Sequence, residues 1–382
     1  MPHAQNQREF NPSTYPDFPT STTSSSSSSS SSSFPTVPLE TISLSALLSP
    51  ETSISSSESE RVFSICKGRG FFYLDLTGGG GGSHERFLQN AERIGELAED
   101  VFKLPMEEKL KYRYMHGGHA GSLDGYKIVG ETVTDKSGTR DTAEFFNVGK
   151  NEMLRPDDQM KRSWPAIIKS NKGLFREYIT TAHGIGMTIL SVIAEKLGVD
   201  PEEFTSRHRI EEESGDHVRL TRGPPREKEE MPEIQTPSHT DFGTITVLMN
   251  WLGGLQVWSE SARQARLLNH EPDVPGEWLW VKPKKGCAII NLGDAAVKFT
   301  NGVLCAGRHR VIPAPGIQGT LPRYSIVYFV RPESKAVMKQ IRGPGIPDGP
   351  EEERDITAGE WIKTQAAGLG VKWEERADKE GE

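Results

Sequence analysis

The chain has 382 residues, a formal net charge of -8 and a pI near 5.8, which argues against binding to nucleic acid or to an anionic membrane surface. No window contains about eighteen consecutive apolar residues, so no transmembrane helix is expected. We therefore expect a small-molecule partner, with no nucleic acid and no membrane.

The three cysteines, Cys66, Cys287 and Cys305, have spacings that suit neither a zinc site nor a disulfide framework. They predict reduced thiols that pack as small hydrophobic groups. The N-terminus also lacks the basic-then-apolar order of a secretory signal. By exclusion we expect a cytoplasmic protein; the oligomeric state stays open, with a monomer favoured.

The first 33 residues are expected to form a disordered tail. They are polar and end in ten consecutive serines, Ser24 to Ser33. Such a composition buries too little apolar surface to offset the entropy of ordering. Beyond this tail we expect a helical and mixed N-terminal region over 34–213, a β-rich core over 214–335 and a C-terminal extension over 336–382.

The N-terminal region combines helices with a few strands. A strand, a run of glycines from Gly78 to Gly82 and a following helix resemble a dinucleotide-binding turn. We reject this interpretation because no Gly-Lys-Ser/Thr follows and the next strand of a βαβ unit is missing. Apolar spacing predicts helices at 61–67, 84–103 and 165–197, and strands at 71–76, 126–130 and 141–148.

From His217 onward the chain consists of short strand patterns separated by Gly, Pro and Asn, which is typical of a β-sandwich or barrel. A further helix is expected near 358–367. The predicted architecture is an α+β fold with a helical N-terminal half laid on an antiparallel β core. The predicted strands are 217–222, 240–248, 254–258, 278–283, 286–291, 302–311 and 322–330.

The stretch from Pro237 to Leu248 alternates and is rich in β-branched residues, so it predicts a strand on which His239 and Asp241 point to the same face. A second imidazole, His309, comes from a later strand. Two imidazoles and one carboxylate form a facial triad, which binds Fe(II) and leaves open coordination positions. A His-x-Asp pair alone is more often a turn or a surface salt link, so the neighbouring motifs have to decide.

Those motifs are similar to the Fe(II)- and 2-oxoglutarate-dependent oxygenases, in the isopenicillin N synthase-like branch. The resemblance runs from about Pro35 to Pro332 and keeps the order of the family's motifs. The matching segments are Gly70–Leu74, Leu104–Lys109, Glu144–Asn147, His239–Thr244, Gly253–Val257, Asn291–Asp294, Thr300–Gly302, His309–Val311 and Arg323–Ser325.

The resemblance implies a distorted double-stranded β-helix, or jelly roll, as the core, with 214–335 as its catalytic part. It implies that His239, Asp241 and His309 bind Fe(II), with no catalytic residue beyond these ligands. Arg323 and Ser325 match the family's Arg-x-Ser pair for the distal carboxylate of 2-oxoglutarate, and their i, i+2 spacing puts both on one strand face. The expected reaction uses O2 and 2-oxoglutarate to hydroxylate or desaturate a small organic molecule, with succinate and CO2 as co-products and specialised metabolism as a candidate setting.

The candidate substrate pocket is less well defined by the resemblance. Where the family carries an Asn or similar residue and a Tyr, this chain has Thr221 and Gly223. How the co-substrate is held without the tyrosine is therefore open, and the glycine predicts a larger pocket. The segment from Ser259 to Gly276 is expected to be an inserted surface loop near the mouth of the site. The candidate pocket residues are Tyr126, His217, Thr221, Arg222 and Leu255.

Two alternatives remain at this point. Oxidases of the isopenicillin N synthase type use the same iron site without 2-oxoglutarate and keep an Arg-x-Ser pair, so that pair alone does not decide. A non-catalytic relative would use the pocket to bind a small ligand, but a pure binder has no need of three iron ligands.

Overall fold

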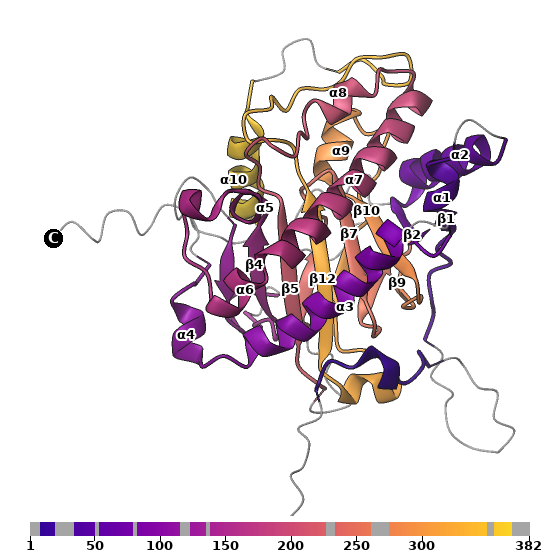
Figure 1. The fold of residues 1–382 in the computed structure, drawn as a ribbon. Coiled ribbons are helices and arrows are strands. Elements are labelled where there is room, and N and C mark those ends of the chain that lie inside the picture. Colours follow the sequence, from indigo (N-terminus) through magenta and orange to yellow (C-terminus); the bar gives the residue numbers. More distant parts are fainter. Residues whose placement is uncertain are drawn as a thin grey trace, which may run out of the picture.

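The computed structural model describes residues 8–19, 34–49, 53–78, 82–114, 123–134, 138–226, 234–260, 275–349 and 355–368. Within these ranges the strands form two sheets that face each other (Figure 1). The strands are β1 (Thr41–Ser43), β2 (Phe71–Asp75), β3 (Gly125–Lys127), β4 (Glu144–Gly149), β5 (His217–Gly223), β6 (Thr236–His239), β7 (Ile245–Asn250), β8 (Leu255–Trp258), β9 (Trp278–Trp280), β10 (Cys287–Leu292), β11 (His309–Val311) and β12 (Arg323–Val330).

The larger sheet has eight strands in the order β1-β2-β10-β7-β12-β5-β4-β3, and the smaller has four in the order β6-β11-β8-β9. Apolar side chains from both sheets, including Phe71, Leu248 and Val257, form a buried cluster between them. The α+β fold with a jelly-roll core is thus the one that the sequence predicts. The N-terminal region contributes more strands than expected, because β1 to β4 all join the larger sheet.

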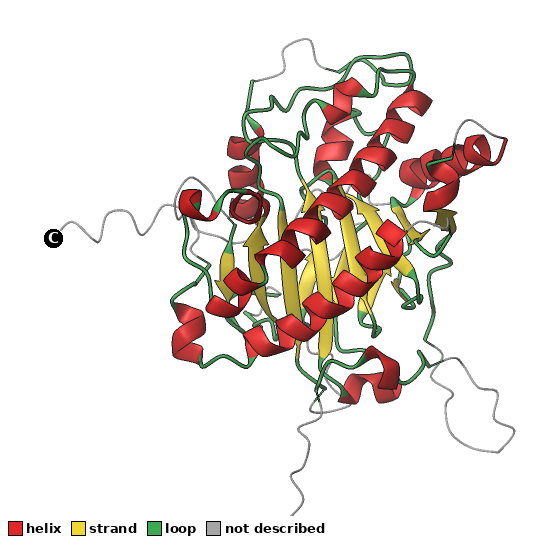
Figure 2. Cartoon of the chain, viewed as in Figure 1, coloured by secondary structure: helices red, strands yellow, loops and turns green. Residues whose placement is uncertain are grey.

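Helices cover the other face of the larger sheet, with α3 and α7 lying across it (Figure 2). None of the helices within the described ranges combines the length and the apolarity that crossing a bilayer requires. The helices are α1 (Leu44–Leu47), α2 (Ser53–Gly68), α3 (Gly82–Phe102), α4 (Met106–Leu110), α5 (Lys150–Leu154), α6 (Ala166–Ser170), α7 (Lys172–Leu197), α8 (Glu202–Thr205), α9 (Asp294–Phe299) and α10 (Ala358–Gly368).

The single helix predicted over 165–197 is divided into α6 and α7 at Asn171. This residue has non-helical dihedral angles, φ -105° and ψ 19°. Its side-chain amide donates to the carbonyl of Ile167 at 2.8 Å, while its backbone N–H bonds Ile168 instead. The asparagine side chain therefore competes with the helical hydrogen bond at this point, as short amide side chains do. The other end agrees with the sequence, because Gly198 caps α7 in the left-handed conformation at φ 68°.

Strand alternation separates two environments along β12. Arg323, Ser325, Val327 and Phe329 point between the two sheets and line the cavity there. The intervening residues, such as Ile326, pack in the core beneath the helices. In any strand, successive side chains point to opposite faces of the sheet. The same alternation therefore decides which side chains of β5 can reach the cavity.

The strand predicted over 240–248 is wrong at its start. Strand β6 ends at His239 and β7 begins at Ile245, and a turn connects them. The backbone N–H of Asp294 donates to the Asp241 carbonyl at 2.7 Å, and that of Ala295 to the Gly243 carbonyl at 3.1 Å. The turn is therefore held by the N-terminal N–H groups of α9, a helix that the sequence analysis does not predict.

The predicted disordered tail is also wrong in part, because residues 8–19 pack against the folded chain. Phe10 is 2% exposed and meets Trp251 edge-to-face at 4.7 Å between ring centroids. The carboxylate of Glu99 on α3 accepts the backbone N–H groups of Glu9 and Phe10 at 3.0 and 2.9 Å. Average polarity misses this segment because two buried aromatic side chains, Phe10 and Phe18, dock it. The remainder of the tail, 1–7 and 20–33, lies outside the described residues.

The inserted loop expected at Ser259 to Gly276 lies mostly outside the described residues. Only its ends, 259–260 and 275–276, are described, and Ser259 pairs there with Glu277 through a backbone hydrogen bond of 2.9 Å. The expectation that it overhangs the site therefore stays a prediction.

Phe10→Ala is expected to lower the free energy of unfolding by about 3 kcal/mol, the usual cost of emptying a buried aromatic site. Urea unfolding followed by far-ultraviolet circular dichroism measures the change. Ser13→Ala is the control, because its hydroxyl contacts only Asn11 on an exposed part of the same segment. Equal stabilities of the two variants would contradict the docking of residues 8–19.

Candidate metal and co-substrate site

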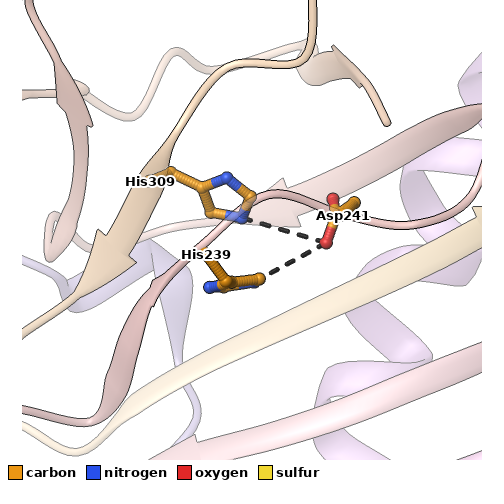
Figure 3. A group of neighbouring side chains, drawn as sticks. All are labelled: His239, Asp241 and His309. Atoms are coloured by element: carbon orange, nitrogen blue, oxygen red, sulfur yellow. Dashed lines mark ion pairs between the residues drawn. The ribbon is translucent and has the colours of Figure 1, made fainter. Parts of the chain in front are cut away.

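Three potential ligand side chains converge at one end of the cavity between the sheets (Figure 3). His239 ends β6, Asp241 lies in the turn after it, and His309 begins β11 directly opposite His239 in the strand register. One ligand atom from each lies within 4.8 Å of the others. The Asp241 Oδ1 atom is 3.6 Å from His239 Nε2 and 3.9 Å from His309 Nε2.

Hydrogen bonds on the outer side of each group aim the three donor atoms inward. His239 Nδ1 lies 2.8 Å from the Pro237 carbonyl and His309 Nδ1 lies 3.1 Å from the Gly307 carbonyl. A carbonyl accepts only, so each Nδ1 carries the proton and each Nε2 keeps its lone pair. Such outer partners fix the tautomer and ring orientation of metal-binding histidines.

The carboxylate of Asp241 is oriented in the same way. Its Oδ2 accepts from the Thr246 hydroxyl at 2.7 Å and from the Asn291 amide at 2.8 Å, which leaves Oδ1 facing the two imidazoles. Burial alone would raise the pKa of Asp241, but the neighbouring imidazoles and the Asn291 hydrogen bond hold it below its usual range. Asn291 and Thr246 thus position the carboxylate. Neither is a site residue predicted from the sequence, where Asn291 stands only in a segment that matches the family.

The charge state of the group suits a divalent cation. Burial, followed by repulsion from His239, lowers the pKa of His309 to about 4. A neutral imidazole and an ionised carboxylate are the forms that bind metals. With Oδ1 and two Nε2 atoms converging, the donor set fits a facial triad for Fe(II).

A cavity of about 70 Å³ extends from the triad between the sheets. Arg323 and Ser325 of β12 project into it, and the Arg323 Nη1 donates to the Ser325 hydroxyl at 3.2 Å. The Arg323 Nε donates to the Gly253 carbonyl at 2.8 Å, which fixes the guanidinium in the wall. Burial lowers the pKa of Arg323 to about 10, so the group stays charged at neutral pH.

Gln235 occupies the place left by the missing tyrosine. A Cβ atom on Gly223 would overlap with Gln235 Oε1, so the amide fills the space that a side chain at 223 would take. The amide is held by a hydrogen bond to the Pro224 carbonyl at 3.0 Å. The larger pocket expected from Gly223 therefore does not result, because a residue from the next segment fills it.

A second cavity of about 260 Å³ adjoins the first and shares wall residues with it, among them His239, Asp241 and Thr221. Its wall combines aromatic and aliphatic side chains with several charged groups. The residues that line it include Tyr114, Leu123, Lys127, Asp141, Phe145, Arg219, Thr221, Gln235, Phe242, Phe329 and Arg331. An apolar cavity of about 150 Å³ holds benzene, so this one has room for a substituted ring.

Two of the five candidate pocket residues line a cavity, and three do not. Thr221 and Leu255 line the smaller cavity, and Thr221 lines the larger one as well. His217 shares the strand face of Thr221, but it is fully buried behind the cavity wall, with its ring 4.9 Å from that of Phe329.

Like His217, Tyr126 and Arg222 line neither cavity, so these three pocket predictions are wrong. The side chains of Tyr126 and Arg222 point to the helical face of the sheet. Tyr126 donates from its hydroxyl to Glu144 at 2.7 Å in the core. Arg222 contacts Tyr324 at 3.2 Å and Glu9 at 3.2 Å. Adjacent strand residues face opposite ways, so Thr221 and Arg222 cannot both reach the cavity.

Arg219 and Arg331 both line the larger cavity, and neither is among the site residues predicted from the sequence. Arg219 lies two residues before Thr221 on β5 and therefore on the same face, a signal that alternation already contains. Arg331 follows the end of β12, where no periodic pattern assigns it a face.

Comparisons with known proteins agree with this geometry. Residues 39–167 match the family model described as the N-terminal part of the non-haem dioxygenases in morphine synthesis, and residues 214–332 match that of the 2OG-Fe(II) oxygenase superfamily. A 2-oxoglutarate-dependent dioxygenase of Aspergillus fumigatus is 30% identical over 341 residues, which cover 85% of this chain and 84% of that protein. The 2-oxoglutarate-dependent dioxygenase gloE of Glarea lozoyensis is 29% identical, over 80% of this chain and 84% of that protein.

Solved structures share the fold. A full-length protein of Neurospora crassa, solved in complex with alpha-KG, superposes with a TM-score of 0.67 at 22% identity, covering 86% of this chain and 96% of that one. A 2OG-Fe(II) oxygenase family protein from Caulobacter crescentus gives 0.66 at 24% identity, covering 87% and 100%. With the family models and relatives covering both halves, the chain belongs to the Fe(II)- and 2-oxoglutarate-dependent oxygenases.

Proposed function

We propose that His239, Asp241 and His309 bind the Fe(II) of this oxygenase. The observation that carries the proposal is the convergence of Asp241 Oδ1 with the two Nε2 atoms, while every outer atom of the three groups is occupied by a hydrogen bond. A site arranged in this way leaves one side of the metal for reactants.

Arg323 and Ser325 would bind the distal carboxylate of 2-oxoglutarate in the smaller cavity. The buried guanidinium has one backbone acceptor and one hydroxyl partner, and it forms no ion pair within the described residues. A buried cation without a carboxylate partner is costly, and a bound carboxylate would offset that cost. Thr221, on the neighbouring strand β5 and opposite Ser325, would complete the polar wall.

With iron, 2-oxoglutarate and O2 bound, the site supplies the oxidising power to remove hydrogen from a substrate, with succinate and CO2 as co-products. The residues of this chain then have three tasks. The triad orients the metal, the Arg323 and Ser325 pair orients the co-substrate, and the apolar wall of the larger cavity excludes water and positions the substrate. Hydroxylation or desaturation of a small organic molecule is the outcome that we propose.

Under this proposal, residues 214–335 form the catalytic core, residues 34–213 form the N-terminal region of the oxygenase, and residues 336–382 form a C-terminal extension. The two sequence relatives named above come from fungi, which supports a role in specialised metabolism. We propose a cytoplasmic monomer. The family assignment favours 2-oxoglutarate-dependent turnover over the two alternatives, an oxidase without 2-oxoglutarate and a non-catalytic binder.

Removal of the metal tests the proposal. Full-length protein treated with EDTA is expected to lose succinate formation from 2-oxoglutarate, and one equivalent of Fe(II) per chain should restore it. Isothermal titration without O2 should give one Fe(II) site and weaker 2-oxoglutarate binding in its absence. Oxygen uptake without succinate would indicate the oxidase instead, and succinate formation that survives chelation would exclude the iron assignment.

A further inference from the structure

The larger cavity contains two arginines with an unusual environment. Arg219 and Arg331 both line it, and both guanidiniums lie over the ring of Phe329, at 5.0 and 5.4 Å from its centroid. The two guanidiniums therefore border the same aromatic side chain in the wall of one cavity. Burial, followed by repulsion from Arg219, lowers the pKa of Arg331 to about 10.

Neither guanidinium forms an ion pair among the residues that the structure describes. Arg219 donates from Nε to the Asn147 side-chain oxygen at 2.9 Å and otherwise lies against Phe145 and Phe329. Arg331 donates from Nη1 to the Gly215 carbonyl at 3.1 Å, and its buried Nε has no hydrogen-bond partner. Arg331 is 2% exposed, so solvent does not compensate.

Asp216, a buried carboxylate that attracts Arg331, is already committed to other partners. Asp216 accepts the Tyr328 hydroxyl at 2.9 Å, the Ser214 hydroxyl at 2.8 Å and the backbone N–H of Arg331 at 2.9 Å. It attracts the Arg331 guanidinium only over a longer range.

Other cations near the cavity have partners. Lys127 pairs with Asp141, and Arg113 outside the wall pairs with Glu131 at 3.1 Å. Arg140 adds another positive charge to the wall and donates to a backbone carbonyl. Within the described ranges, the cavity arginines that form no ion pair are therefore Arg219, Arg331 and Arg140.

We propose that the substrate is a small carboxylic acid whose carboxylate binds Arg219 and Arg331. This proposal rests on the proposed function. Its apolar body would lie against Phe145, Phe242 and Phe329, which line the same cavity together with the ligands His239 and Asp241. Arginine guanidiniums bind carboxylates through paired, charge-assisted hydrogen bonds, and a carboxylate supplies the acceptors that the free donors lack. The cavity volume of about 260 Å³ suits an acid built on one substituted ring.

The probes are matched pairs of acids and primary amides, namely benzoate with benzamide, 3-phenylpropanoate with 3-phenylpropanamide, and 2-naphthoate with 2-naphthamide. Each is titrated calorimetrically into full-length protein that holds Fe(II) and 2-oxoglutarate without O2. At least one acid is expected to bind about 10- to 100-fold more tightly than its amide, because a charge-assisted pair replaces a neutral contact. Equal affinities in every pair, or no binding of any acid, would overturn the proposal.

Variants identify the residues responsible. Arg331→Gln and Arg219→Gln are each expected to reduce the acid preference to about threefold or less, while Arg331→Lys keeps part of it. Arg86→Gln is the matched control, because Arg86 lies on α3, away from the cavity, and forms an exposed ion pair with Glu177 of α7. A preference that persists in both glutamine variants would also overturn the assignment.

Iron content, 2-oxoglutarate affinity and thermal midpoint are measured on the same samples. A wild-type protein that fails to hold iron and 2-oxoglutarate counts against the proposed function. A wild-type protein that holds both but binds acids and amides equally counts only against the anionic substrate. Since Arg331 lines only the larger cavity, Arg331→Gln should leave the 2-oxoglutarate affinity within about twofold of wild type.

Discussion

Asp241→Ala is expected to reduce both Fe(II) affinity and succinate formation by more than about 100-fold, because loss of an outer hydrogen-bond partner already costs about 10- to 100-fold and a ligand contributes more. The substitution removes the only carboxylate of the triad and leaves Thr246 and Asn291 without their acceptor. Anaerobic titration with Fe(II) and a succinate assay measure the two effects.

Two further variants make this result specific. Asn291→Ala keeps the carboxylate but removes one of the two hydrogen bonds to its Oδ2, so its Fe(II) affinity and succinate formation should fall between those of wild type and Asp241→Ala. His84→Ala removes a histidine on α3, outside the site, and should change neither measurement. Iron affinity that survives in Asp241→Ala, with the fold intact by circular dichroism, would remove Asp241 from the ligand set.

The iron-site candidates can be predicted from the sequence even though the strand pattern predicts their local structure wrongly. Strand alternation places His239 and Asp241 on one face, whereas the chain leaves the strand after His239. The two side chains still converge, since the turn is tied to the N-terminus of α9 through the carbonyls of Asp241 and Gly243. Sequence spacing indicates that the two groups are near each other, but the backbone contact that holds the turn comes from Asp294 at the start of α9.

The pocket is less predictable because its walls come from distant strands. Alternation on β5 would select Arg219 with Thr221 and exclude Arg222, whose partner Glu9 lies in the segment expected to be disordered. The role of Gln235 cannot be read from the chain, since only the folded structure brings its amide onto Gly223. Local periodicity thus assigns faces within a strand, and tertiary contacts decide what fills the space.

Arg323→Met is expected to raise the KM for 2-oxoglutarate by roughly 100-fold or more, because it leaves a buried carboxylate of the co-substrate without its cation. The turnover number at saturating 2-oxoglutarate should fall much less, since Arg323 binds the end of the co-substrate far from the iron ligands in the proposed arrangement. Steady-state succinate formation at varied 2-oxoglutarate separates the two parameters.

Ser325→Ala tests the same subsite with a smaller change. Its hydroxyl accepts from Arg323 and contributes one neutral donor to the carboxylate, so an increase in KM of about fivefold is expected. Arg323→Met also removes the donor to the Gly253 carbonyl, and the thermal midpoint and Fe(II) content therefore have to be measured alongside. If Arg323→Met bound iron normally and kept the wild-type KM, 2-oxoglutarate would have to bind elsewhere, and Arg219, which lines both cavities, would be the next residue to replace.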